Sequence, residues 1–65
     1  MIEPGETYSS PNYGRKITVL SIDKETAESY TLDILWIEPD DESPTVLDTL
    51  VVSKQDAARW VKVAY

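Results

Sequence analysis

Most of the chain follows a two-residue alternation of apolar and polar side chains, which is the period of a β-strand. In residues 29–38, Tyr30 and every second residue up to Trp36 share one face. Leu35 and Ile37 make the end of the opposite face apolar as well. A strand that is apolar on both faces fits a strongly bent barrel strand or one that another element covers.

Two further stretches predict strands because both are rich in β-branched and apolar residues. They are residues 15–22, with the sequence RKITVLSI, and residues 45–52, with TVLDTLVV. Between the three strands lie a polar connector, residues 23–28, and an acidic loop that begins and ends with proline, residues 39–44. Both connections carry the turn-forming and charged residues that favour exposed loops.

The C-terminal part predicts one short helix and a last strand. Ser53 can cap a helix, and Asp56 lies in the first turn, where the helix dipole favours an anion. We expect this helix to cover Lys54 to about Trp60, followed by a short strand near residues 61–64. A continuous helix to Val63 is the alternative.

These elements predict a mainly β fold for the single domain of residues 1–65. Residues 3–14 are dense in turn formers, and Pro11 to Gly14 predicts a β-turn. Long strands, tight turns and one short helix fit a small, partly open antiparallel β-barrel better than a helical bundle. Trp36 and Trp60 are expected in its core, because the chain has no phenylalanine.

The opening of the chain resembles that of SH3-like small barrels. The residues that carry the resemblance are Pro4-Gly5-Glu6-Thr7-Tyr8 and then Gly14-Arg15 with residues 17–23, ITVLSID. In such barrels this stretch forms the first strand, a diverging turn and the next strand, and residues 50–63 are similar to their short helix and closing strand. Many very short bacteriophage and prophage proteins have this layout. The resemblance implies an SH3-like fold and no particular function.

Charge is unevenly distributed along the chain. The net charge is −6, and nine of the 12 carboxylates lie between Asp23 and Asp48, where Lys24 is the one cation. Such a balance opposes binding to nucleic acid or anionic lipid, because both need clustered Lys and Arg. A partner protein would have to accept an acidic face.

Several classes of activity are disfavoured by composition. The chain has neither histidine nor cysteine, so no imidazole base, thiolate nucleophile or disulfide is available, and we expect no enzyme, cofactor or metal site. Residues 40–42 could hold a hard cation only weakly, because they lack the ligand spacing of a calcium loop. No secretory signal or membrane span is evident, and we expect a cytoplasmic protein, in the host cell if phage-encoded.

The acidic residues therefore become the candidate binding site. Carboxylates on a rigid sheet can imitate a phosphate backbone and occupy a basic groove, as small acidic phage proteins, including anti-CRISPR proteins, are known to do. We expect the chain to inhibit a host nucleic-acid-binding defence complex in this way, with Tyr13 as an aromatic anchor on the opposite flank. The predicted contact residues are Asp33, Glu38, Asp40, Asp41, Glu42, Asp48 and Tyr13.

Two other functions stay open. A structural or assembly subunit, of a phage or another multiprotein complex, could bind its partner through apolar edges of the barrel. Weak nucleic-acid binding would need the basic residues of the two terminal segments to meet on one face. Those residues are Arg15, Lys16, Lys54, Arg59 and Lys62.

Overall fold

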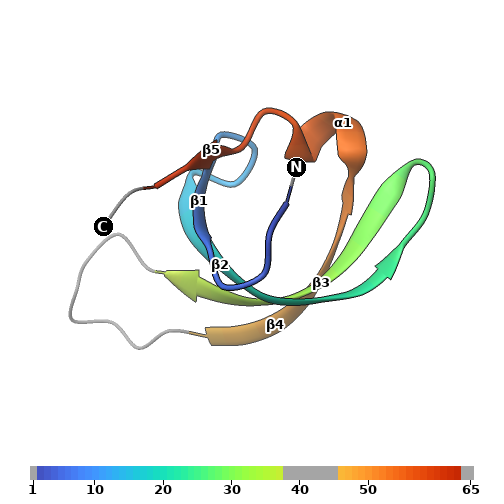
Figure 1. Cartoon of the computed structure of the whole chain (residues 1–65). Coiled ribbons are helices and arrows are strands. Elements are labelled where there is room, and N and C mark those ends of the chain that lie inside the picture. Colours follow the sequence, from blue (N-terminus) through green and yellow to red (C-terminus); the bar gives the residue numbers. More distant parts are fainter. Residues whose placement is uncertain (1, 38–45, 64–65) are drawn as a thin grey trace.

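The computed structural model describes residues 2–37 and 46–63, which form one curled antiparallel sheet and a short helix (Figure 1). The order of the strands in the sheet is β4-β3-β2-β1-β5, and the sheet does not close on itself. The elements along the chain are β1 (Thr7–Ser10), β2 (Arg15–Glu25), β3 (Ser29–Ile37), β4 (Val46–Ser53), α1 (Lys54–Ala57) and β5 (Val61–Lys62). The prediction of a mainly β, partly open barrel with one short helix is confirmed.

Two glycines at positive φ shape the N-terminal turns. Gly5, at φ 86°, follows Pro4, so that proline and glycine occupy the two central positions of the turn before β1. Gly14, at φ 66°, ends the turn between β1 and β2, and its N–H donates to the Ser10 carbonyl at 2.9 Å. Only glycine adopts such angles without steric cost, which explains its place at both turns.

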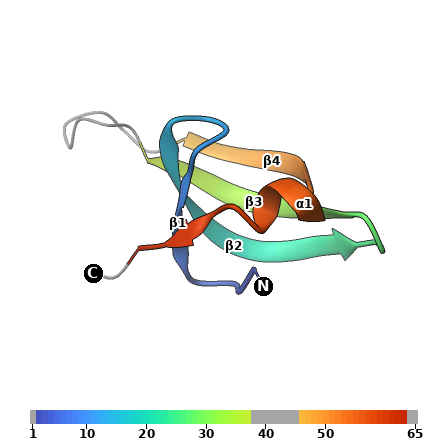
Figure 2. The same ribbon diagram turned by 90° about the horizontal axis from the view of Figure 1, so that it is seen from above.

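The sheet curls most strongly along β2. The pairing of β2 with β3 shifts register twice, between Val19 and Ser21 and again between Ile22 and Lys24. Each shift inserts an extra residue into β2, which bends the strand and increases its twist. Figure 2 shows the result, with β1 and β5 crossing one side of the curved β2–β3–β4 sheet. Strand β2 continues to Glu25, so the first half of the expected polar connector is strand.

The core lies on the concave face of this sheet. Ile17, Val19, Leu32 and Ile34 are completely buried there. The alternation of β3 is as predicted, with Tyr30, Leu32 and Ile34 inside and the intervening side chains only half-buried. Buried apolar residues from both ends of the chain close the open side of the curl: Ile2, Tyr8, Ala57 and Trp60. Val52, on β4, is buried on the same concave face as Leu32.

The C-terminal segment is shorter in both elements than expected. Ser53 caps α1 as predicted, because its hydroxyl accepts a hydrogen bond from the Asp56 N–H at 3.1 Å. The helix ends at Ala57, so the predictions of a helix to Trp60 or to Val63 are both wrong. The chain turns there because Trp60 must pack against Tyr8, with ring centroids 6.1 Å apart.

The last strand joins the first one. β5 is antiparallel to β1, with Tyr8 opposite Lys62, and the Val63 N–H donates to the Thr7 carbonyl at 2.8 Å. The two ends of the chain therefore meet in the sheet, as in the expected barrel. The expected strand extended to Ala64, which lies outside the described residues.

Candidate protein-binding surface

The outer face of β4 exposes apolar side chains. Leu47 is 69% exposed and Val51 65% exposed, and both lie on the convex side of the sheet. Leu20, at the first register shift of β2, is 43% exposed and lines a pocket of about 480 Å³. The pocket is lined by Leu20, Ser21, Asp33, Leu47, Asp48 and Thr49. We call Leu20, Ser21, Asp33, Leu47, Thr49 and Val51 the β4 surface.

A hydrogen-bonded carboxylate occupies the middle of the β4 surface. Asp33 accepts from the Ser21 hydroxyl at 3.2 Å and from the Thr49 hydroxyl at 3.2 Å. Asp23, which lies at the second register shift of β2, contacts the same Ser21 hydroxyl at 3.3 Å. A hydrogen bond to the Asp33 carboxyl is the main cause that raises the pKa of Asp23 above its ordinary value. Two carboxyl groups thus compete for one hydroxyl beside the apolar side chains.

A second cluster surrounds Trp36 at the other side of the sheet. The Trp36 indole N–H donates to the Asp48 carboxylate at 3.0 Å, and the Tyr13 ring meets the Trp36 ring edge-on at 5.3 Å. The Arg15 guanidinium lies 5.7 Å from the centre of the Trp36 ring. The indole hydrogen bond is the main cause that lowers the pKa of Asp48, followed by a bond from the Thr49 N–H. Trp36 is only half-buried at the rim of the core, so its prediction as a core residue holds in part.

The structure brings together some of the predicted contact residues and separates others. Tyr13 and Asp48 both contact Trp36. Asp33 lies on the opposite face, because its cross-strand partner is Thr49, whereas Asp48 is opposite the buried Ile34. The other predicted contact residues lie outside the described part of the chain: Glu38, Asp40, Asp41 and Glu42.

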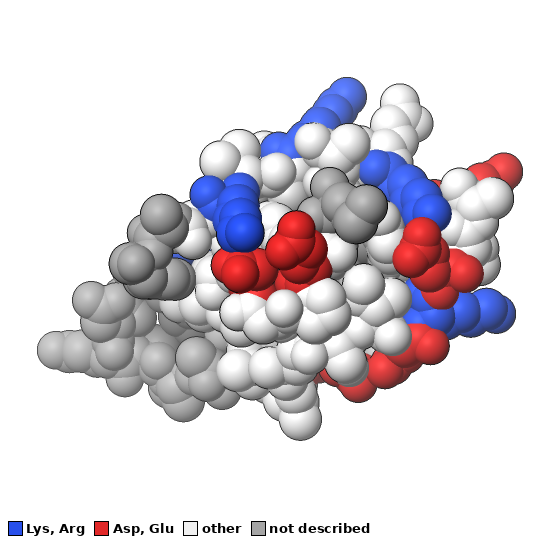
Figure 3. Space-filling model, in the orientation of Figure 1, with Lys and Arg blue, Asp and Glu red and all other residues white. Residues whose placement is uncertain are grey.

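Basic side chains lie beside acidic ones. The Lys62 ammonium group is 3.7 Å from Glu6 and 4.0 Å from Glu3. In the upper part of the face drawn in Figure 3, basic (blue) and acidic (red) side chains lie next to each other. The middle of the lower part, where Figure 1 places β4, is covered by uncharged side chains. Pairing with carboxylates weakens any attraction of these cations for nucleic acid.

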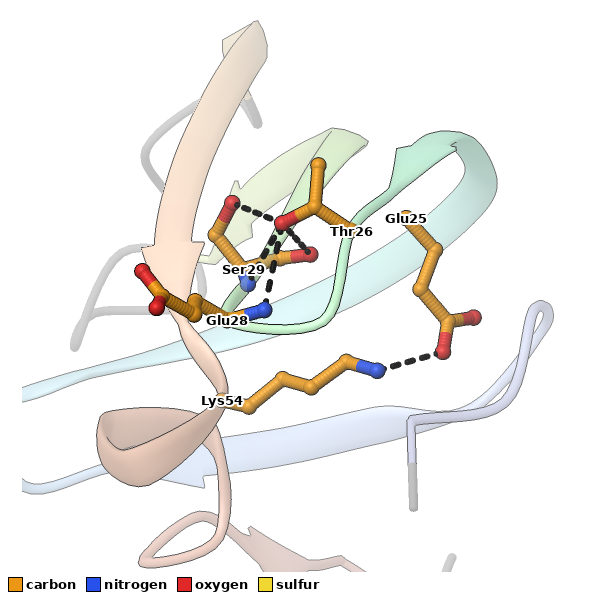
Figure 4. Close-up of polar contacts among 5 residues, drawn as sticks. All are labelled: Glu25, Thr26, Glu28, Ser29 and Lys54. Atoms are coloured by element: carbon orange, nitrogen blue, oxygen red, sulfur yellow. Dashed lines mark hydrogen bonds and ion pairs between the residues drawn. The ribbon is translucent and has the colours of Figure 1, made fainter.

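Lys54 holds the junction between β4 and α1 (Figure 4). The Lys54 ammonium group is 2.7 Å from the Glu25 carboxylate, which is the main cause that raises the Lys54 pKa. The Lys54 N–H donates to the Glu28 carbonyl at 2.8 Å. Beside it, the Thr26 hydroxyl accepts from the N–H groups of Glu28 and Ser29 and so closes the β2–β3 turn. These bonds fix the register between β3 and the end of β4.

The apolar pattern of residues 45–52 is a signal in the sequence for the β4 surface. Leu47 and Val51 alternate with Val46, Leu50 and Val52, so residues 45–52 are apolar on both faces. A strand of this kind needs cover on both sides. The core supplies cover on one side only, and Leu47 and Val51 stay exposed on the other.

No protein-family model matches the chain, and comparisons with curated proteins and with solved structures found no match. The resemblance to SH3-like phage proteins therefore stays a prediction. Within residues 2–37 and 46–63, no three acidic side chains converge as metal ligands. In the same ranges, no helix has the length and the hydropathy that a membrane span requires.

Proposed function

We propose that the chain is a non-catalytic protein-binding module whose partner presents a basic surface. The observation that carries this proposal is the pair of carboxyl groups of Asp23 and Asp33, which share the Ser21 hydroxyl. Asp33 lines the same pocket as the exposed Leu20 and Leu47. Like charges held this close repel each other, and a Lys or Arg of a partner would relieve that repulsion. The apolar neighbours would exclude water from the same contact.

In its more specific form, the proposal is that the module inhibits a nucleic-acid-binding defence complex, such as a CRISPR effector or a restriction enzyme. The net charge of −6 favours encounter with a basic groove. Asp33 and Asp48 face opposite sides of the sheet, so one flat basic surface would reach only one of them. Imitation of a phosphate backbone therefore depends on the acidic segment around Asp40, Asp41 and Glu42.

The inhibitor can be tested with a purified CRISPR effector or restriction endonuclease bound to fluorescent DNA. We expect the chain to displace the DNA, less effectively as salt rises, because charge pairing is screened. Replacing Asp40, Asp41 and Glu42 together by lysine should abolish displacement, whereas Glu28→Lys, in the β2–β3 turn, should leave most of it. Failure to displace DNA from effectors of both classes, or displacement that improves at high salt, would refute the inhibitor.

A structural or assembly subunit is the second candidate, and the exposure of Leu47 and Val51 favours it. For such a subunit, replacing Leu47 and Val51 by serine should abolish partner binding, because the buried apolar area would be lost. The triple lysine variant should then bind almost as well as the original chain. The two variants thus separate charge-driven from apolar recognition.

A further inference from the structure

The two edge strands of the described sheet differ in how well they are protected against pairing with another chain. β5 has only two residues and carries Lys62, and short, charged edges discourage strand addition. β4 has eight residues and contains no Lys, Arg or Pro, with Asp48 as its one charged residue. β4 is therefore the edge that is open to a further strand.

The backbone groups that face this open edge follow from the register. The Lys54 N–H donates to the Glu28 carbonyl, so Glu28 and Lys54 form a hydrogen-bonded pair. Two residues further along each strand, Tyr30 is opposite Val52. Hydrogen-bonded pairs alternate along an antiparallel ladder, so the even-numbered residues of β4 bond to β3. The backbone groups of Leu47, Thr49 and Val51 therefore point away from β3.

The Thr49 amide agrees with this assignment. Its N–H donates to the side chain of the neighbouring Asp48 at 2.8 Å instead of to a carbonyl of β3. The side chains of Leu47, Thr49 and Val51 lie on the outer face, because their cross-strand partners are Leu35, Asp33 and Thr31. An added strand that pairs with these residues would therefore meet Leu47 and Val51 of the β4 surface on the outer face.

Charge decides which strand fits this edge. A second copy could pair its β4 with this one, placing Leu47 opposite Val51 and Thr49 opposite Thr49. The two Asp48 side chains would then be diagonal neighbours at roughly 7–8 Å, and each copy carries a net charge of −6. A strand with a Lys or Arg at the positions flanking Asp48 would turn this repulsion into attraction.

We propose that β4 binds an extended segment of a partner protein as an additional antiparallel strand, in which apolar side chains alternate with Lys or Arg. The apolar side chains pack on Leu47 and Val51, and a basic side chain on the other face meets Asp48. Backbone pairing with Leu47, Thr49 and Val51 supplies the affinity, as in other cases of β-strand addition. The Thr49 N–H then exchanges the Asp48 carboxylate for a carbonyl of the added strand. This inference rests on the proposed function, a partner with a basic surface, and it adds a basic contact at Asp48, on the face of the sheet opposite Asp33.

The probe is a blocked seven-residue peptide in which valine and lysine alternate, titrated into the isotopically labelled chain. We expect the amides of Leu47, Thr49 and Val51 to gain protection from hydrogen exchange, while those of Leu50 and Val52 change little. A peptide with glutamate in place of lysine should bind at least about tenfold more weakly, and the difference should shrink at high salt.

Two peptides with N-methyl groups provide the matched control, because they leave the fold of the chain untouched. Methylation of the peptide amides that face β4 should weaken binding at least about tenfold, because it removes several hydrogen bonds. Methylation of the alternate amides should have little effect. On the side of the chain, Val51→Pro should weaken binding far more than Val51→Ala, because only proline removes an outward N–H.

Each other outcome has a distinct meaning. Lysine-dependent binding could instead map to Tyr13 and Trp36, or be equally strong for both methylated peptides. Either result would overturn strand addition but would still support a basic partner. Equal binding of the lysine and glutamate peptides would overturn the basic partner itself. Protection of Leu47, Thr49 and Val51 that depends on the concentration of the chain alone would identify a second copy as the occupant and overturn the proposed one.

Discussion

Leu32 and Leu47 lie on neighbouring strands and have opposite surroundings, so they make a matched pair of substitutions. Leu32 is completely buried, whereas Leu47 is 69% exposed. Truncating a buried leucine to alanine loses about 2.4 kcal/mol of transfer free energy, roughly three methylene equivalents. The cavity left behind raises the cost of Leu32→Ala to about 3–5 kcal/mol.

For Leu47 the same sum gives a much smaller effect. About a third of its side chain is covered, so Leu47→Ala should cost about 0.7 kcal/mol. A domain of this size has a free energy of unfolding of roughly 3–10 kcal/mol. Leu32→Ala therefore removes a large part of the stability, and Leu47→Ala leaves the fold almost unchanged.

Urea denaturation followed by tryptophan fluorescence measures both values, because buried Trp60 becomes exposed on unfolding. The denaturation midpoint of Leu47→Ala should stay close to that of the original chain. A loss for Leu47→Ala as large as that for Leu32→Ala would mean that the outer face of β4 is already covered. The β4 surface could then not be a binding surface.

Two further predictions concern single polar groups. Asp23→Asn should stabilise the fold at pH 7, because the raised pKa of Asp23 means that its ionisation beside Asp33 disfavours the folded state. The folded state binds the Asp23 proton more tightly than the unfolded state does, so the advantage of the variant should vanish as the pH falls below 3.8. A denaturation midpoint of Asp23→Asn at or below that of the original chain at pH 7 would contradict the reasoning. Ser53→Ala should lower the free energy of unfolding by about 1 kcal/mol, because the cap on α1 is lost. Ser53→Asp should keep most of this stability, because aspartate also caps helices. Equal losses for both variants would show that the cap does not contribute.

Much of the fold could be predicted because it is encoded over short distances along the chain. The alternation around Leu32 predicted β3, and Ser53 with Asp56 predicted the start of α1. The end of α1 could not be predicted in this way. It depends on the contact of Trp60 with Tyr8, two residues that lie far apart in the sequence.

The candidate site was predictable in part. The exposed Tyr13 was expected as an aromatic contact residue, and its packing against Trp36 came only from the structure. The closeness of Asp23 and Asp33 depends on the register shift between Ile22 and Lys24, which leaves no clear mark in the sequence. The pattern of charges therefore indicated an acidic surface without indicating which carboxylates meet.

The sequence by itself determined that this protein is acidic, lacks imidazole and thiol groups, and alternates as strands do. These properties follow from composition and from the two-residue period of extended backbone. Only the tertiary structure decided which apolar face stays bare. The curl of the sheet encloses Leu32 and Val52 and leaves Leu47 and Val51 outside, because a single layer of strands and one short helix can cover only one side of β4.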